Sequence, residues 1–359
     1  MTSMRGRLTK RLYGMFSLLV GIPALAGAET DQQRFGAHGL ALPATFSGTL
    51  PCADCPGIEY HLDIWNEDQG YALRRTYLER DHVEDELGRW YVDPVRNALI
   101  LEGTGNARSE WQITPDQDIR LLDQEGEPIV SDLPYTLVAG PLVPTELRLP
   151  VTGLMTYFAD AALFTECLSG QRFPIAMEAD YLALERAYLD ADIEPGAPLI
   201  ARIDAEISMR AQTEGSDRMT VTVERFHHVT PDAACPDTRS AAGLLNTFWG
   251  LTHLDGVEQD QTDGRQEPYV LISEDGTRFS GTMGCNRFMG PLSIAGDSVE
   301  FGPVASTMMA CPPELAAREA AFAEMLEAAQ RVDLMDHSLR LLGETGAEPA
   351  RFRAVYTRY

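Results

Sequence analysis

The chain has 359 residues, and its 54 Asp and Glu against 29 Lys and Arg give a formal net charge of −25. This acidity argues against nucleic acid and anionic lipid as partners. It can attract cations, although adaptation of an exported protein to salty surroundings is the simpler explanation. The length is typical of two or three domains. Lys10 is the only lysine.

Residues 1–28 have the pattern of a secretory signal. Its basic residues are Arg5, Arg7, Lys10 and Arg11. An apolar run over residues 15–25 and small residues up to Ala28 follow, as signal cleavage requires. A membrane anchor is the alternative, but the run is short and contains Pro23. We expect cleavage after Ala28 and no transmembrane segment thereafter.

Cleavage at this point would leave 25 basic residues against 54 acidic ones, a net charge of −29, and no lysine. The absence of lysine excludes a Schiff-base lysine, a P-loop lysine and a Ser-Lys dyad. No cysteine lies near the cleavage point, so no lipid anchor is evident from the sequence.

A first domain is expected over residues 44–139, where short strands alternate with turns. In residues 58–64, apolar side chains alternate with Glu59, His61 and Asp63, which predicts a half-buried strand with one polar face. A turn at residues 66–70 leads into its partner strand. Other predicted strands cover residues 71–78, 90–92, 98–102, 110–113 and 119–122. We expect a small antiparallel β-barrel.

Residues 46–58 (FSGTLPCADCPGI) carry the most specific motif of this domain. With residues 121–123 and 133–135, this run resembles the N-terminal domain of NlpE-type copper-resistance lipoproteins. The resemblance implies a small β-barrel of the bacterial outer membrane with a role in envelope-stress signalling and copper tolerance. The chain lacks the lipidated cysteine of those relatives, so their anchor does not carry over.

A second β-rich domain is expected over residues 150–229, after a proline-marked linker at residues 140–150. Its predicted strands cover residues 153–158, 199–209 and 219–226, and its one predicted helix covers residues 179–191. Residues 157–167 resemble the C-terminal OB-like domain of the same NlpE proteins, which implies a second small barrel. An OB barrel suggests nucleic acid, but the acidic charge argues against that partner.

A third domain is expected over residues 244–359, after a second linker at residues 230–243. Residues 279–288 and 306–311 resemble the META domain of HslJ-type heat-inducible proteins, which implies an α+β fold. Residues 314–332 make the best predicted helix of the chain. Its apolar face comprises Leu315, Phe322, Met325, Leu326 and Ala329, and its solvent face comprises Glu319, Glu324 and Gln330.

Six cysteines in an exported chain imply three disulfides, with 15 pairings possible in principle. Their positions are Cys52, Cys55, Cys167, Cys235, Cys285 and Cys311. Local pairing within successive domains is the simplest solution. We therefore predict that Cys285 pairs with Cys311 and that Cys167 pairs with Cys235.

The pair Cys52 and Cys55 has three interpretations. It can be a static structural disulfide, or a labile disulfide that reports redox or metal status. A catalytic thioredoxin-type centre is rejected, because that motif needs a βαβ setting. His61 could complete a Cys-Cys-His site for Cu(I), although a solvated histidine is the simpler interpretation.

Methionines suggest a further Cu(I) site of thioether ligands, although methionine more often fills cores. The residues concerned are Met283, Met289, Met308 and Met309. The chain shows no HExxH, GxSxG or paired-carboxylate arrangement that stands out, so we expect no enzyme and no required cofactor.

The sequence thus predicts a mainly β, three-domain, non-enzymatic protein of the periplasm, with outer-membrane association as an option. It would act as a binding or sensing accessory in metal, redox or envelope stress, with another envelope protein as its partner. The alternatives are a carrier whose barrel holds copper or a small ligand, and a purely structural or interaction protein.

Overall fold

The structure is a computed structural model that describes most of the chain after residue 34. The described residues are 35–104, 107–158, 161–194, 196–211, 217–231, 233–236, 241–259 and 265–358. The expected signal at residues 1–28 lies outside them. Among the described residues, no helix is long and apolar enough to cross a membrane. The fold is mainly β, as predicted, and residues 33–359 form one compact unit.

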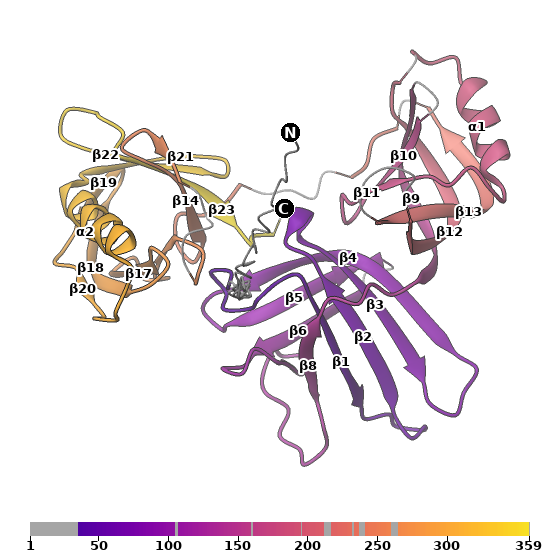
Figure 1. Ribbon diagram of the computed structural model, residues 1–359, viewed down its shortest axis with the longest axis horizontal. Coiled ribbons are helices and arrows are strands. Elements are labelled where there is room, and N and C mark those ends of the chain that lie inside the picture. The colour runs from indigo at the N-terminus through magenta and orange to yellow at the C-terminus, as the bar shows by residue number, and fades with distance from the viewer. Residues whose placement is uncertain are drawn as a thin grey trace, which may run out of the picture. The chain divides into compact units, whose positions relative to one another are not determined.

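The first domain is a closed antiparallel barrel whose strands pair in chain order, with β1 also pairing with β8 (Figure 1). Its strands are β1 (Ala44–Leu50), β2 (Ile58–Ile64), β3 (Gly70–Tyr77), β4 (Val83–Asp93), β5 (Ala98–Gly103), β6 (Ala107–Ile113), β7 (Ile119–Leu121) and β8 (Thr136–Pro141), with a 3-10 turn η1 (Glu67–Gln69) before β3. Alternate residues of these strands fill the interior, including Phe46, Trp90 and Trp111, each at most 1% exposed.

The polar face of β2 is less exposed than its alternation predicts. Asp63 is fully buried, because residues that follow β8 cover it. Its carboxylate accepts hydrogen bonds from the Thr45 hydroxyl at 2.5 Å and from the Thr145 backbone N–H at 2.8 Å. Residues 143–145, which belong to the predicted linker, are therefore bound to the outer face of the barrel.

The second domain is a five-stranded antiparallel sheet in the order β11-β10-β9-β12-β13. Its elements are β9 (Leu147–Phe158), β10 (Ala161–Glu166), β11 (Arg172–Pro174), α1 (Tyr181–Leu189), β12 (Leu199–Arg210) and β13 (Arg218–Thr230). A bridge between Ile175 and Val221 brings the two ends of the sheet together. Five strands that curl into a partly open barrel are the OB architecture, as predicted.

The third domain is built on a sheet in the order β15-β14-β16-β17-β18-β19-β21-β22-β23, and pairing of β14 with β23 closes it into a ring. Its elements are β14 (Phe248–Leu254), β15 (Val257–Glu258), β16 (Tyr269–Ile272), β17 (Arg278–Thr282), β18 (Arg287–Ala295), β19 (Ser298–Phe301), β20 (Ala305–Ser306), α2 (Pro313–Ala328), β21 (Arg331–Met335), β22 (Ser338–Leu342) and β23 (Ala350–Val355). The apolar face of α2 packs into the core of this domain through Phe322, Met325 and Leu326, and Leu315 on the same helix is also buried.

Several predicted boundaries differ from the structure, and two of them have a clear cause in strand pairing. The helix ends at Ala328 instead of residue 332, because Ala329 is extended and the chain then forms β21, which pairs with β22. Strand β9 begins at Leu147, inside the predicted linker, because residues 147–150 pair with β12. In both places strand pairing overrides the local sequence signal.

Residues from both ends of the described chain meet beside the barrel core. The His38 ring lies edge-on to Trp90 and to Tyr356, with ring centroids 5.3 and 4.3 Å away. The Val92 backbone N–H donates to the Tyr356 carbonyl at 2.9 Å. Burial lowers the pKa of His38 to about 3, so this ring is neutral at physiological pH.

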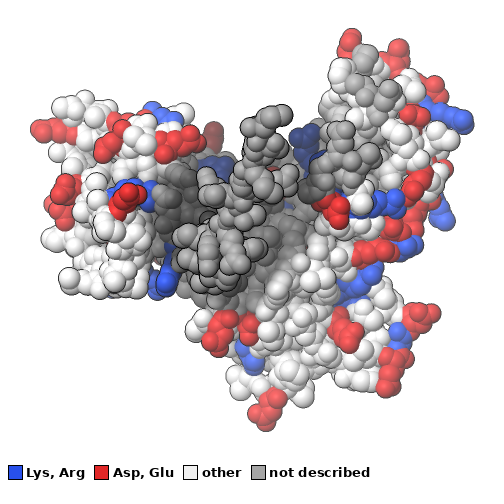
Figure 2. Space-filling view, viewed as in Figure 1, with Lys and Arg blue, Asp and Glu red and all other residues white. Residues whose placement is uncertain are grey.

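Acidic side chains are spread over the face of the molecule drawn in Figure 2, with arginines set among them. Arginine side chains of the described residues pair with carboxylates; Arg148, for example, contacts Glu146, Glu206 and Glu224. The negative charge is thus dispersed over the described surface in this view.

Candidate functional site: the disulfides and their surroundings

The loop between β1 and β2 carries the first disulfide. Cys52 and Cys55 are bonded, with their Cα atoms 5.3 Å apart. The loop is fixed at its base, where the Leu78 backbone N–H donates to the Gly57 carbonyl at 3.0 Å. Both cysteines are partly exposed, so small reductants and partners can reach them.

An ion pair holds the tip of this loop against the turn between β3 and β4. The Arg80 guanidinium lies 2.9 Å from Asp54 Oδ2 and also donates to the Asp54 backbone carbonyl. Asp54 Oδ1 is in turn 3.5 Å from Cys52 Sγ. One acidic and one basic side chain therefore set the electrostatic field at this disulfide.

His61 does not join the two cysteines. Ligand atoms of Cys52, Asp54 and Cys55 lie within 4.8 Å of one another, and His61 is outside this group. Its Nε2 instead lies 2.8 Å from the Val143 carbonyl and 3.2 Å from Asp63 Oδ1. The hydrogen bond to Asp63 raises the pKa of His61 above its usual value. The His61 side chain therefore helps to hold the segment after β8 against the barrel.

The second disulfide joins Cys167 to Cys235, with Cα atoms 5.1 Å apart. It ties the segment after β13 to the end of β10. A cavity of about 700 Å³ lies beside it, with mainly apolar walls. Its lining includes Leu149, Val151, Glu166, Leu168, Ile200 and Arg202.

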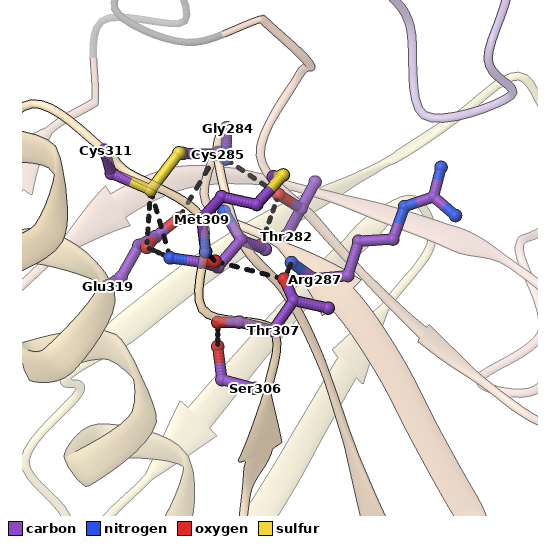
Figure 3. The surroundings of a disulfide bond; sticks show 10 residues. Thr282, Gly284, Cys285, Arg287, Ser306, Thr307, Met309, Cys311 and Glu319 are labelled. Atoms are coloured by element: carbon purple, nitrogen blue, oxygen red, sulfur yellow. Dashed lines mark hydrogen bonds between the residues drawn. A yellow bond between two sulfur atoms is a disulfide. The ribbon is translucent and has the colours of Figure 1, made fainter.

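The third disulfide, between Cys285 and Cys311, lies in a dense polar network (Figure 3). Asn286 is the centre of this network. Its amide nitrogen donates to Cys311 Sγ at 3.0 Å and to Glu319 Oε2 at 2.7 Å. Its amide oxygen accepts from the Thr307 hydroxyl at 3.0 Å and from the Met309 backbone N–H at 2.8 Å.

Glu319 is a site residue that the sequence analysis missed, since helical periodicity assigned it to solvent. Its Oε1 accepts the backbone N–H groups of Cys285 at 3.2 Å and Asn286 at 2.6 Å. The carboxylate thus reaches from α2 to the loop between β17 and β18. The available sequence signal was the spacing, because Glu319 lies eight positions after Cys311 and about two helical turns into α2.

The methionines of the proposed thioether site do not form one group. Met283 is buried in the core of the third domain, whereas Met289, Met308 and Met309 are exposed. Met308 is 99% exposed. A core role therefore applies to Met283 alone among these four.

Family models match three successive parts of the chain. They are the NlpE N-terminal domain at residues 46–132, the NlpE C-terminal OB domain at residues 147–236 and the META domain at residues 242–356. Lipoprotein NlpE of Escherichia coli strain K12 is 31% identical over 203 residues, which cover 55% of this chain and 81% of that protein.

Superpositions of the whole chain on solved structures have low TM-scores. The crystal structure described as the Cpx pathway activator NlpE from Escherichia coli is 28% identical, covers 55% of this chain and 100% of its own, and has a TM-score of 0.25. The NMR structure of a protein from Burkholderia xenovorans is 25% identical, covers 35% of this chain and 96% of its own, and has a TM-score of 0.26.

The closed barrel, the OB-type sheet and the three disulfides define a modular, disulfide-bonded β protein. With the sequence identity to Lipoprotein NlpE, the chain belongs to the NlpE family, and it carries a META domain after the two NlpE domains.

Proposed function

We propose that this chain is an exported, non-enzymatic protein of the bacterial envelope that senses envelope stress and passes the signal to a protein partner. Its location would be the periplasm. The observation that carries the proposal is the position of the partly exposed Cys52–Cys55 disulfide inside the part of the chain matched by the NlpE N-terminal domain. The dispersed acidic surface favours a protein partner over nucleic acid.

The sensing step would be reduction of the Cys52–Cys55 disulfide. A dithiol reductant supplies two electrons and two protons to the S–S bond, which leaves two thiols and an oxidised reductant. Cu(I), a soft ion that prefers thiolate ligands, can then bind the two sulfurs, with release of the thiol protons to solvent. Loss of the cross-link would also leave the loop tip held mainly by Arg80 and Asp54, so its surface could rearrange against a partner.

A carrier that stores cargo inside the barrel is the less favoured alternative. Large apolar side chains, among them Phe46, Leu62, Trp90 and Trp111, occupy the interior and are at most 1% exposed. Interiors packed in this way leave little room for a ligand. The exposed loop is therefore the better candidate for metal binding.

Graded reduction with thiol trapping tests the proposal. Peptide mapping would show which disulfide opens first, and Cu(I) competition would compare wild type with Cys52→Ser/Cys55→Ser. We expect Cys52–Cys55 to open before the other two pairs, and the double variant to bind Cu(I) more weakly. If all three pairs open together and copper affinity is unchanged, the pair is only a structural cross-link.

A further inference from the structure

The META domain holds a second group of potential metal ligands, separate from the loop of the first domain. Ligand atoms of Cys285, Cys311 and Glu319 lie within 4.8 Å of one another, and all three residues are partly buried. The two cysteines are disulfide-bonded, so their sulfurs are not free ligands in this state. Reduction would convert both into thiols beside a carboxylate.

We propose that the reduced Cys285–Cys311 pair and Glu319 together bind a thiophilic divalent cation such as Zn²⁺. The existing geometry needs little change for this. Glu319 Oε2 is 3.8 Å from Cys311 Sγ. Two ligands of one tetrahedral Zn²⁺, with Zn–S of about 2.3 Å and Zn–O of about 2.0 Å, lie about 3.5 Å apart. The two sulfurs, once freed, have to separate to about 3.8 Å.

The groups around the ligands are already arranged as a supporting shell. Glu319 is oriented by the backbone N–H groups of Cys285 and Asn286, and the Asn286 amide bridges Cys311 and the Glu319 carboxylate. Hydrogen bonds of this kind fix ligand orientation in metal sites. Figure 3 shows the two cysteines and Glu319 converging from the β17–β18 loop, the segment before α2, and α2 itself.

The carboxylate of this group is also better fixed than the one beside the first disulfide. Glu319 is partly buried and accepts two backbone N–H groups, whereas the Asp54 side chain in the first domain is 73% exposed.

Opening the disulfide requires one co-reactant, a dithiol reductant. A dithiol reductant gives two electrons and two protons to the S–S bond and is itself oxidised to a disulfide. Zn²⁺ then displaces the two thiol protons and forms two Zn–S bonds, while the Glu319 carboxylate supplies an oxygen ligand. The META domain would thus bind metal only under reducing conditions.

Zn²⁺ protection against alkylation tests this site in the full chain. The protein is reduced, mixed with Zn²⁺ alone and treated with iodoacetamide, and each cysteine is then quantified by peptide mass mapping. We expect Zn²⁺ to slow alkylation of Cys285 and Cys311 in wild type. In Glu319→Gln, the Zn²⁺ concentration needed for this protection should rise about tenfold or more.

Two control variants separate this site from its surroundings and from the first domain. Glu324→Gln changes an exposed residue of α2 and should protect like wild type. Cys52→Ser/Cys55→Ser should also retain protection at Cys285 and Cys311, whether or not the proposed function holds. Circular dichroism would verify folding, and Glu319→Asp, with its shorter reach, replaces Glu319→Gln if the latter does not fold. Equal alkylation with and without Zn²⁺, or unchanged protection in the folded Glu319 variant, would overturn the proposal.

Discussion

Asp63 and Thr145 lie 82 positions apart in the chain, yet the buried Asp63 carboxylate accepts the Thr145 backbone N–H at 2.8 Å. This hydrogen bond fixes the segment after β8 on the outer face of β2. The covered face explains why a strand with an alternating sequence pattern has a fully buried acidic residue.

Asp63→Asn should destabilise the first domain. The amide can replace only part of the acceptor capacity that serves Thr45 and Thr145, which leaves a buried donor without a partner. We expect a loss of about 2–3 kcal/mol in the free energy of unfolding, measured by urea denaturation. Glu59→Gln, at an exposed position of the same strand, should stay within about 0.5 kcal/mol of wild type. Equal losses in both variants would contradict the assigned role.

His61 should make the protein less stable as the pH rises. Its pKa is raised in the folded state, mainly by the hydrogen bond to Asp63. The stabilisation is therefore fully present below the unfolded value of 6.5 and is lost as the pH rises through the raised pKa. Because the side chain is one-third exposed, the difference between wild type and His61→Gln across pH 6–8 should be below about 1 kcal/mol. If the stability advantage of wild type over His61→Gln grew as the pH rose, this account would be refuted.

His38 should have the opposite effect. Burial lowers its pKa from 6.5 to about 3, so between these pH values the ring is protonated in the unfolded chain and neutral in the folded chain. The neutral ring is accommodated above pH 6.5, and stability falls as the pH drops from there toward 3. At pH 5 the loss from this group should be about 2 kcal/mol. Thermal or urea unfolding should show a shallower acid-side slope in His38→Gln, and identical slopes would contradict this account.

The electrostatic effect of Arg80 and Asp54 on the first disulfide can be tested with two variants that change the local charge in opposite directions. Arg80→Gln leaves the Asp54 charge uncompensated beside Cys52, which disfavours a thiolate. Alkylation of the reduced pair at neutral pH should slow about two- to fivefold. Asp54→Asn should accelerate it by a similar factor. Stopped-flow alkylation measures both rates, and changes of the same sign in the two variants would contradict the assignment.

Local sequence patterns predicted much of this fold. The alternation over residues 58–64 corresponds to β2, and its predicted partner over residues 71–78 corresponds to β3. The apolar face predicted for the helix that begins near Pro313 is buried. These features depend on period and on turn residues, both of which are local.

The features that local patterns did not predict depend on contacts between distant parts of the chain. Periodicity assigned Glu319 to solvent, because it cannot show that a disulfide holds another loop above that helix face. His61 has the spacing of a metal ligand, but its ring contacts Asp63, two positions further along β2, and the Val143 carbonyl in the segment after β8. The helix stops early because the residues after it join the sheet beside β19, where Arg331 pairs with Ser298 and the Val332 N–H donates to the Asp297 carbonyl. Each of these three positions thus depends on at least one contact with a residue distant in the chain.

An envelope-stress reporter in a bacterial strain without its own copy of this protein tests the central claim most directly. The strain would express wild type or Cys52→Ser/Cys55→Ser at equal levels and would be exposed to copper or to a dithiol reductant. We expect wild type to raise reporter activity after either treatment, and the double variant to respond at least several-fold less. A response that is the same with wild type, with the variant and without the protein would contradict a sensing role for this chain.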